Sequence, residues 1–138
     1  MRIFLDTNVL VSSAATRGLC ADVLREVLIH HQLVISAPLL TELKNALRKK
    51  LSVPDDLTAE LVEILQQDSH FSTSSPLADI DIKDKNDLII LSSALNGGAD
   101  LFITGDRKLL ELKKAGNMEI VSPRTFWEKL KAQPRDEL

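Results

Sequence analysis

The stretch Met1-Arg2-Ile3-Phe4-Leu5-Asp6-Thr7-Asn8-Val9-Leu10-Val11 decides the fold of this chain. Its short apolar run, residues 3–5, ends directly at the carboxylate of Asp6. A continuous apolar run predicts a strand buried on both faces, as in a parallel sheet covered by helices. Ligands of such sheets bind beyond the carboxyl ends of the strands, so Asp6 stands where a site is expected. Asp is also a common helix N-cap, and this stretch alone leaves both roles open.

The rest of the chain alternates between the patterns of strands and helices. Further strands are predicted at residues 33–35, 101–104 and 118–121, with a short edge strand at residues 70–73. Apolar spacing predicts helices over residues 21–31, 38–51, 57–67, 86–96 and 108–115, and a last one from Pro123. In the helix at 57–67 we expect Leu57, Leu61, Ile64 and Leu65 to face the core. The alternation indicates an α/β fold with a mostly parallel sheet.

Length and composition exclude several classes of protein. The 138 residues contain no internal repeat or long linker, so we expect one domain, residues 1–138, with a frayed tail at residues 134–138. No apolar stretch approaches the roughly 20 residues that cross a membrane, and the first residues lack the pattern of a signal peptide. The single Cys20 fits a reducing compartment, and we expect a cytoplasmic protein without a membrane partner.

The charge balance limits how the chain could bind nucleic acid. With 17 Lys and Arg against 20 Asp and Glu, the formal charge is −3, so nucleic acid must meet a local basic patch or bound cations. Aromatic residues make up 4% of the chain, with no Tyr, which argues against binding single strands by base stacking.

Four carboxylates occupy comparable places in this arrangement. Asp6 and Asp106 each follow a predicted strand, so parallel neighbours would bring them together although they are far apart in sequence. Glu42 lies in the first turns of the helix after the second strand, where an acid also suits the helix dipole. Asp87 stands one turn before Leu91 on the buried stripe of its helix. Asp84, three residues earlier, fits a helix cap or an additional ligand.

Carboxylates that converge in this way need protons or cations. Two unit charges 4 Å apart repel by about 4 kcal/mol at an effective dielectric constant of 20. Oxygen ligands without a convergent His or Cys favour Mg²⁺ or Mn²⁺. Several acids around such a cation suit phosphodiester hydrolysis by a metal-activated water. The sequence therefore predicts a catalytic metal site made by Asp6, Glu42, Asp87 and Asp106.

Basic residues lie near two of these acids. Lys44, Arg48, Lys49 and Lys50 extend the helix of Glu42, and Arg107 and Lys108 follow Asp106. A solvated helix face is one reading of this charge. The other is a rim that contacts a phosphate backbone, for which Lys44, Arg48, Arg107 and Lys108 are the candidates.

These residues together resemble the motifs of PIN-domain ribonucleases. The first motif is residues 4–10 around Asp6, and the second is residues 37–43, ending in Thr41-Glu42-Leu43. The third runs from Asp84-Lys85-Asn86-Asp87 through Leu91 and Ala94 to Gly97-Gly98-Ala99-Asp100. The fourth is residues 101–106, ending in Thr104-Gly105-Asp106 and followed by Leu109 and Leu110. Lys85 and Asn86 depart from the more acidic centre that the third motif often has.

The resemblance implies both a fold and an activity. The fold would be three-layered, α/β/α, with a mostly parallel sheet of about five strands. The activity would be cleavage of single-stranded RNA with Mg²⁺ or Mn²⁺, leaving a 5′-phosphate and a 3′-hydroxyl. Asp6, Glu42, Asp87 and Asp106 would bind the metal, with support from Asn8 and Thr104. The nearest subgroup is similar to VapC toxins, which implies a toxin–antitoxin pair, a homodimer and an antitoxin that blocks the site.

Two other functions stay open at this point. A phosphate-receiving switch domain of the response-regulator kind also holds Mg²⁺ after its first strand. It should carry adjacent acids there and a Lys after its last strand, whereas this chain has Asp6-Thr7-Asn8 and Ser122-Pro123. A catalytically inactive PIN domain that only binds nucleic acid or protein is the second alternative, although none of the four acids is missing.

Overall fold

A computed structural model of the chain describes residues 1–132. The tail expected to be frayed, residues 134–138, lies outside this part. Within residues 1–132, no helix is long and apolar enough to cross a membrane.

The centre of the fold is one sheet of six strands, ordered β3-β2-β1-β4-β6-β5. The five strands from β3 to β6 pair in parallel, and β5 is antiparallel to β6. The strands are β1 (Arg2–Leu5), β2 (Gln32–Ser36), β3 (His70–Ser72), β4 (Leu101–Ile103), β5 (Lys114–Ala115) and β6 (Met118–Val121). The expected parallel sheet of about five strands is confirmed, with one short antiparallel strand added.

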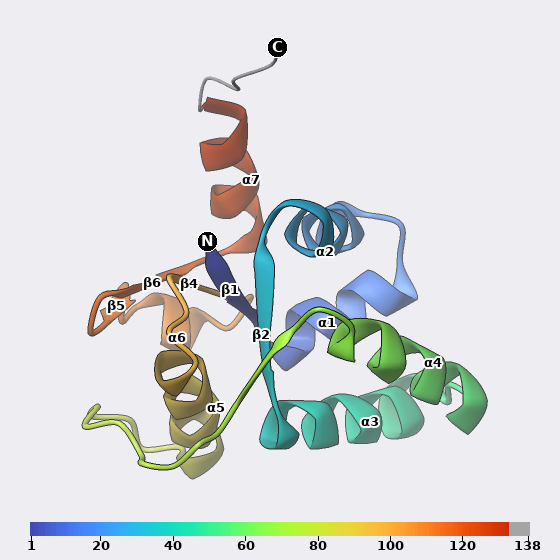
Figure 1. Ribbon diagram of the computed structural model, residues 1–138, viewed down its shortest axis with the longest axis horizontal. Helices are drawn as coiled ribbons and strands as arrows, with labels where there is room; N and C mark the ends of the chain where they lie inside the picture. The colour runs from blue at the N-terminus through green and yellow to red at the C-terminus, as the bar shows by residue number, and fades with distance from the viewer. Residues whose placement is uncertain (133–138) are drawn as a thin grey trace.

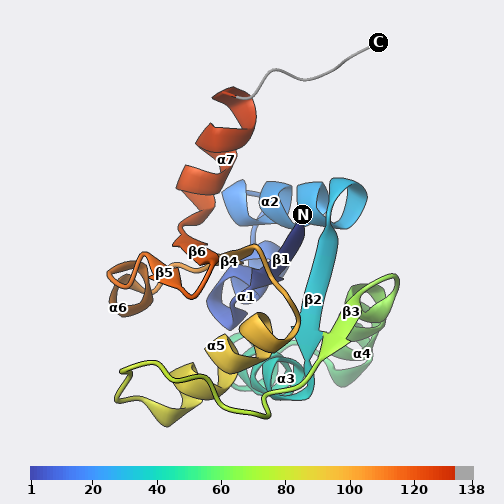
Figure 2. The same cartoon turned by 60° about the vertical axis from the view of Figure 1, so that its left-hand side comes forward.

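Helices cover both faces of this sheet. The helices are α1 (Thr7–Ala15), α2 (Leu19–His30), α3 (Ala37–Leu51), α4 (Asp55–Gln66), α5 (Lys85–Asn96), α6 (Arg107–Leu110) and α7 (Pro123–Ala132). Figure 1 shows α1 to α4 on one side of β2, and α5 and α6 on the other. Figure 2 shows α7 rising beside α2, with which it packs. Right-handed crossovers produce this division, because the chain moves first to one side of β1 and then to the other.

The strand order separates this fold from a phosphate-receiving domain. In flavodoxin-like receiver proteins the order is 2-1-3-4-5, so the third strand lies beside the first. Here β1 lies between β2 and β4, and β3 lies at the edge of the sheet beyond β2. The phosphate-receiving alternative therefore does not match the observed topology.

The core is aliphatic, as the composition requires. Ile3, Phe4 and Leu5 of β1 are fully buried, and the rings of Phe4 and Phe102 stack with centroids 5.3 Å apart. A strand buried on both faces is what the continuous apolar run predicts. The first strand is thus the centre of the sheet and of the core.

Two expectations about helices were wrong. Leu57 and Ile64 do not face the core: they are 52% and 50% exposed, because α4 begins at Asp55 and buries Thr58, Val62 and Leu65 instead. Residues 108–115 are not one helix, since α6 ends at Leu110. The left-handed backbone of Lys113 (φ 63°) turns the chain into β5, and Gly116 (φ 59°) supplies the positive φ of the hairpin turn to β6.

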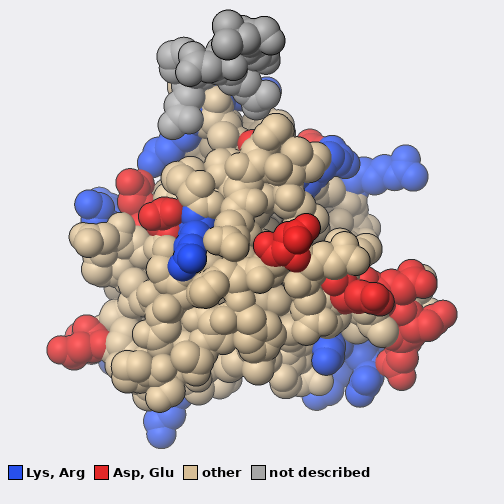
Figure 3. Space-filling model, viewed as in Figure 1, with Lys and Arg blue, Asp and Glu red and all other residues tan. Residues whose placement is uncertain are grey.

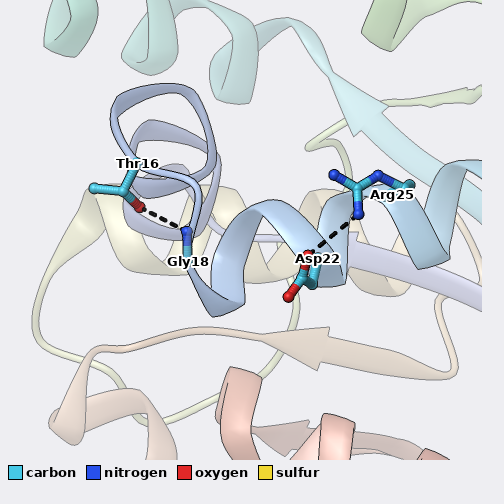
Figure 4. A network of polar contacts seen from close by, with 4 residues as sticks. All are labelled: Thr16, Gly18, Asp22 and Arg25. Atoms are coloured by element: carbon cyan, nitrogen blue, oxygen red, sulfur yellow. Dashed lines mark hydrogen bonds and ion pairs between the residues drawn. The ribbon is translucent and has the colours of Figure 1, made fainter.

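A short turn joins α1 to α2. Thr16 ends α1, and its hydroxyl accepts a hydrogen bond of 3.4 Å from the N–H of Gly18, which precedes α2 (Figure 4). One turn into α2, Arg25 pairs with Asp22 at 3.2 Å. This connection returns the chain so that β2 can pair beside β1 in parallel.

Candidate active site

The candidate site lies where the strand order reverses. Leu5 of β1 is opposite Ile103 of β4, and the N–H of Asp6 donates to the carbonyl of Ile103 at 2.9 Å. From β1 the chain proceeds to β2 on one side, and it later returns to β4 on the other. The loops that follow β1 and β4 therefore diverge and leave a crevice, which is the usual ligand position in an open parallel sheet.

Asp6 acts as a helix cap and also belongs to this crevice. Its Oδ1 accepts from the N–H of Thr7 at 2.8 Å, capping α1. Its Oδ2 accepts from the hydroxyl of Thr104 at 2.7 Å and from the amide of Asn8 at 3.2 Å. The carboxylate is 8% exposed and is fixed by three donors. The two readings of Asp6 that the sequence left open are thus compatible.

Thr104 and Asn8 join the end of β4 to the start of α1. The fully buried Thr104 also accepts from the N–H of Asp106 at 3.0 Å. Asn8 accepts from the N–H of Gly105 at 3.0 Å through its Oδ1. Hydrogen bonds of this kind fix the direction of the carboxylates that they touch. Asn8 and Thr104 both donate hydrogen bonds to Asp6.

Glu42 and Asp87 approach the same crevice from opposite faces of the sheet. Ser36 caps α3 by accepting from the N–H of Leu39, and Glu42 follows in the second turn of that helix. Thr7 donates from its Oγ1 to Glu42 Oε1 at 3.4 Å, which links α3 to α1. Asp87 is half-buried in the first turn of α5.

Asp84 and Asp106 both cap helices. Asp84 accepts from the N–H groups of Asn86 and Asp87, at 2.8 and 3.1 Å, at the start of α5. Asp106 accepts from the N–H of Lys108 at 2.9 Å at the start of α6. A carboxylate in such a position uses one oxygen for the helix and leaves the other available.

The four predicted acids line one open cavity of about 590 Å³. It is lined by Asp6, Thr7, Asn8, Val11, Ser12, Glu42, Asn45, Ala46, Lys49, Lys50, Asp87 and Asp106. Asp84 lies in an adjoining cavity of about 310 Å³, which also contacts Asp87 and Lys108. Asp6, Glu42, Asp87 and Asp106 thus come from four separate segments of the chain to one place, and Asp84 lies beside it.

Burial, together with the charge of neighbouring acids, raises the pKa values of Asp6, Glu42 and Asp87. Burial raises the pKa of Asp6, and the charge of Asp106 adds to this shift. Burial also raises the pKa of Glu42, with a further rise from the charge of Asp6. The pKa of Asp87 rises through burial and through the charges of Asp84, Asp106 and Asp6. The cavity is therefore a place where negative charge accumulates without enough positive charge to offset it.

The four acids line the same cavity, but their carboxylates do not converge on a single point. Among residues 1–132, no three His, Cys, Asp or Glu side chains are arranged so that they could hold one metal ion between them. Mutual repulsion of carboxylates gives a physical reason for this separation, since it decreases with distance. The donor set fits a hard cation chemically, because every acid in the cavity offers only oxygen.

The basic residues that line the cavity differ from those that the sequence led us to expect as phosphate contacts. Lys49 and Lys50 line the cavity, whereas Lys44, Arg48 and Arg107 do not. Arg48 instead pairs with Asp55 of α4 at 3.4 Å, and Lys108 lines the adjoining cavity. Figure 3 shows blue atoms gathered over the C-terminal half of α3, beside red atoms over α4. The signal was available, because Asn45, Ala46, Lys49 and Lys50 are three, four, seven and eight residues after Glu42 and share its face.

Known proteins share this architecture. The sequence model of the family described as PIN domain matches residues 2–108. Among solved structures, the chain is similar to that of VapBC2 from Rickettsia felis bound to a DNA fragment from their promoter. The TM-score is 0.63 at 18% identity, over 88% of this chain and 98% of that one. It is also similar to VapBC-1 from nontypeable Haemophilus influenzae, with a TM-score of 0.58 at 19% identity, over 90% and 99% of the two chains.

At these identities the structural likeness shows the fold. No curated protein sequence matches the chain. The family match spans all four predicted acids, from Asp6 to Asp106, and most of the chain. The protein therefore belongs to the PIN domain family.

Proposed function

We propose that this protein is an Mg²⁺- or Mn²⁺-dependent endoribonuclease that hydrolyses phosphodiester bonds of single-stranded RNA. The observation that carries the proposal is the single cavity onto which Asp6, Glu42, Asp87 and Asp106 open from four different elements. Membership of the PIN domain family supports it, since that family contains ribonucleases with acids at these motifs.

Asp6, Glu42, Asp87 and Asp106 would hold the cation. When bound, it would lower the pKa of a water so that the water can attack, and would offset charge on the leaving oxygen. The raised pKa values of Asp6, Glu42 and Asp87 support this assignment, because carboxylates that resist ionising together are stabilised by a cation.

The remaining polar residues hold the acids in place. Thr104 and Asn8 fix Oδ2 of Asp6, and Thr7 contacts Glu42. Asp84 is assigned to capping α5, because its carboxylate binds two backbone N–H groups and lies outside the cavity of the other acids.

The decisive experiment is RNA cleavage by the wild type and by Asp6→Asn. Single-stranded RNA should be cut with Mg²⁺ or Mn²⁺ by the wild type, with products that carry 5′-phosphates and 3′-hydroxyls. Asp6→Asn should be inactive, whereas Asp79→Asn, an exposed acid that does not line the cavity, should be active. Equal activity of wild type and Asp6→Asn refutes the site. No activity of any of these proteins on varied RNAs favours an inactive PIN domain that only binds.

We further propose that the nuclease is the toxin of a type II toxin–antitoxin pair and acts in the cytoplasm. The support is the similarity in fold to structures of VapBC2 and VapBC-1. Expression of the wild type should arrest growth, expression of Asp6→Asn should not, and the product of a neighbouring gene should restore growth by binding the protein. Growth that is unaffected by an active nuclease would separate the toxin proposal from the enzymatic one.

A homodimer is proposed from the resemblance to VapC toxins, with one structural support. Leu28 of α2 and Ile64 of α4 line a common surface cavity and are 36% and 50% exposed. Ile29 and Leu57, on the same two helices, are 65% and 52% exposed. Exposed apolar side chains that lie together, as Leu28 and Ile64 do, are typical of a surface that another protein covers. Sedimentation equilibrium of the wild type and of Ile64→Lys tests the assignment.

A further inference from the structure

The cavity that contains the acids extends along a second, basic region. Its far part lies between α1 and α3 and is called the α1–α3 groove below. It is made by Val11, Ser12, Asn45, Ala46, Lys49 and Lys50. The same cavity therefore has carboxylates at one end, at the edge of the sheet, and two ammonium groups near the C-terminal end of α3.

The geometry of α3 separates these two ends by a definite distance. Lys49 follows Glu42 by seven residues, which is about 10 Å along a helix axis at 1.5 Å per residue. At roughly 100° per residue, Lys49 stands about 20° and Lys50 about 80° from Glu42 around the axis, whereas Lys44 and Arg48 stand about 160° and 120° away. Only two of the four basic residues on this helix can therefore face what the acids bind.

We propose that the α1–α3 groove binds the RNA segment next to the bond that is cut, with Lys49 and Lys50 contacting its phosphates. The inference rests on the proposed function, which places the scissile phosphate among the acids. A polyanion is repelled by four carboxylates, and two cations further along its path offset this repulsion. Lys acts as a compact point charge with three donors, which suits a phosphate whatever base is attached.

The wall between the charged ends fits a nucleotide. Val11 and Ala46 offer a small apolar surface, and Asn45 and Ser12 offer an amide and a hydroxyl within the same groove. An acidic segment of another protein is a less suitable occupant. It could contact the two lysines, but it has no phosphodiester bond to place among the acids.

The chain supplies a matched control for the test. Lys49→Gln/Lys50→Gln removes two charges from the groove, and Lys44→Gln/Arg48→Gln removes two from the other side of the same helix. Arg48 pairs only with the exposed Asp55 in the described structure, so the control pair should fold normally. Urea unfolding of both pairs confirms that each is folded.

Binding is measured first, without cleavage. Both pairs are placed in the Asp6→Asn background, and the anisotropy of a fluorescein-labelled oligouridylate is followed at several KCl concentrations. The groove pair should bind several-fold more weakly, and its slope of log K against log salt should fall by about 0.7 for each lost phosphate contact on a single strand. The control pair should keep its slope. Equal slopes for the two pairs overturn the inference.

A second ligand distinguishes RNA from protein. If the groove pair keeps its affinity for oligouridylate but no longer binds polyglutamate, the groove holds an acidic protein segment and the RNA assignment is wrong.

Cleavage then separates this inference from the proposed function. The groove pair, with Asp6 intact, should have a lower kcat/KM for the oligonucleotide and an unchanged kcat/KM for uridylyl-uridine, which has no flanking phosphate. Cleavage by the wild type with equal effects of both pairs rejects the groove and retains the nuclease. If the wild type does not cleave RNA, the proposed nuclease activity is wrong. The binding measurement then shows whether RNA binds in the α1–α3 groove.

Discussion

Thr104 donates a hydrogen bond of 2.7 Å from its Oγ1 to Oδ2 of Asp6, joining the end of β4 to the end of β1. Oγ1 of Thr104 also accepts a hydrogen bond of 3.0 Å from the backbone N–H of Asp106, and Thr104 is fully buried. One hydroxyl therefore contacts two of the four acidic residues. It therefore helps to fix the positions of both residues.

Replacing this hydroxyl should cost stability. Thr104→Val keeps the shape of the side chain but leaves the N–H of Asp106 without its hydroxyl partner, and leaves Oδ2 of Asp6 with only the amide of Asn8. The expected loss is about 1–3 kcal/mol of unfolding free energy, measured by urea denaturation. Thr104→Ser, which keeps the hydroxyl, should recover most of this loss and should also recover RNA cleavage. Equal destabilisation by Val and Ser would show that Thr104 acts through packing alone.

The acids should make stability depend on pH in a specific direction. Burial and the charge of Asp6 raise the pKa of Glu42 above its ordinary value of 4.5. A carboxyl with a raised folded-state pKa favours the folded state below its unfolded pKa, and this contribution is lost as the pH rises through the folded pKa. Glu42→Gln cannot ionise, so its advantage over the wild type should grow from below pH 4.5 towards neutral pH.

Thermal unfolding of Glu42→Gln and the wild type across this pH range measures the effect. The melting temperature of the variant should exceed that of the wild type by a few degrees at neutral pH, and the difference should shrink on acidification. Glu63→Gln removes an exposed carboxylate of α4 outside the cavity and controls for the loss of one charge. A constant difference at every pH would contradict the prediction.

Divalent cations should stabilise the wild type through the same acids. A ligand that binds only the folded state adds about 2.7 kcal/mol at a concentration 100 times its dissociation constant. We expect Mn²⁺ to raise the melting temperature of the wild type in a way that EDTA reverses. Asp6→Asn and Asp87→Asn should lose most of this rise, and Asp79→Asn should keep it. If Mn²⁺ raises the melting temperature of Asp6→Asn as much as that of the wild type, the cation binds elsewhere.

Gly97 should tolerate no side chain. A Cβ on Gly97 would lie 2.5 Å from Cγ1 of Val34 and 3.0 Å from Cβ of Ser72, because the end of α5 packs directly on β2 and β3. Gly97→Ala should destabilise the fold by about 1–3 kcal/mol, as overpacking does. Gly18→Ala is the matched control, since the nearest atom to its Cβ is 3.6 Å away. Equal unfolding midpoints for the two variants in urea would contradict this account.

Local signals explain why so much of the fold could be predicted. The buried run in β1, the Ser36 cap with Pro38 behind it, and the Asp84 cap of α5 depend on residues close in sequence. The positions of Asp6 and Asp106 follow from one further rule, that parallel strands end at the same edge. These signals were enough to bring four acids to one cavity.

Other features depend on contacts or backbone conformations that the sequence does not display. The change from α6 to the strand β5 depends on the positive φ of Lys113. A lysine gives no indication in the sequence that its φ is positive. Arg48 stands about 120° from Glu42 around the axis of α3, but its ion pair with Asp55 depends on the packing of α4, which the sequence does not display. The separation of the acids is a relationship between distant segments of the described residues, so motif spacing alone could not reveal it.

The central position of β1 also determines when, during synthesis, the cavity can form. β1 is synthesised before its neighbour β4 and the loop of Asp106, which follow about a hundred residues later. Until then Thr104 is absent from Oδ2 of Asp6, and the crevice lacks one wall. A nascent or truncated chain therefore cannot assemble the four-acid cavity. Synthesis that is interrupted before residue 106 would release a fragment without this cavity.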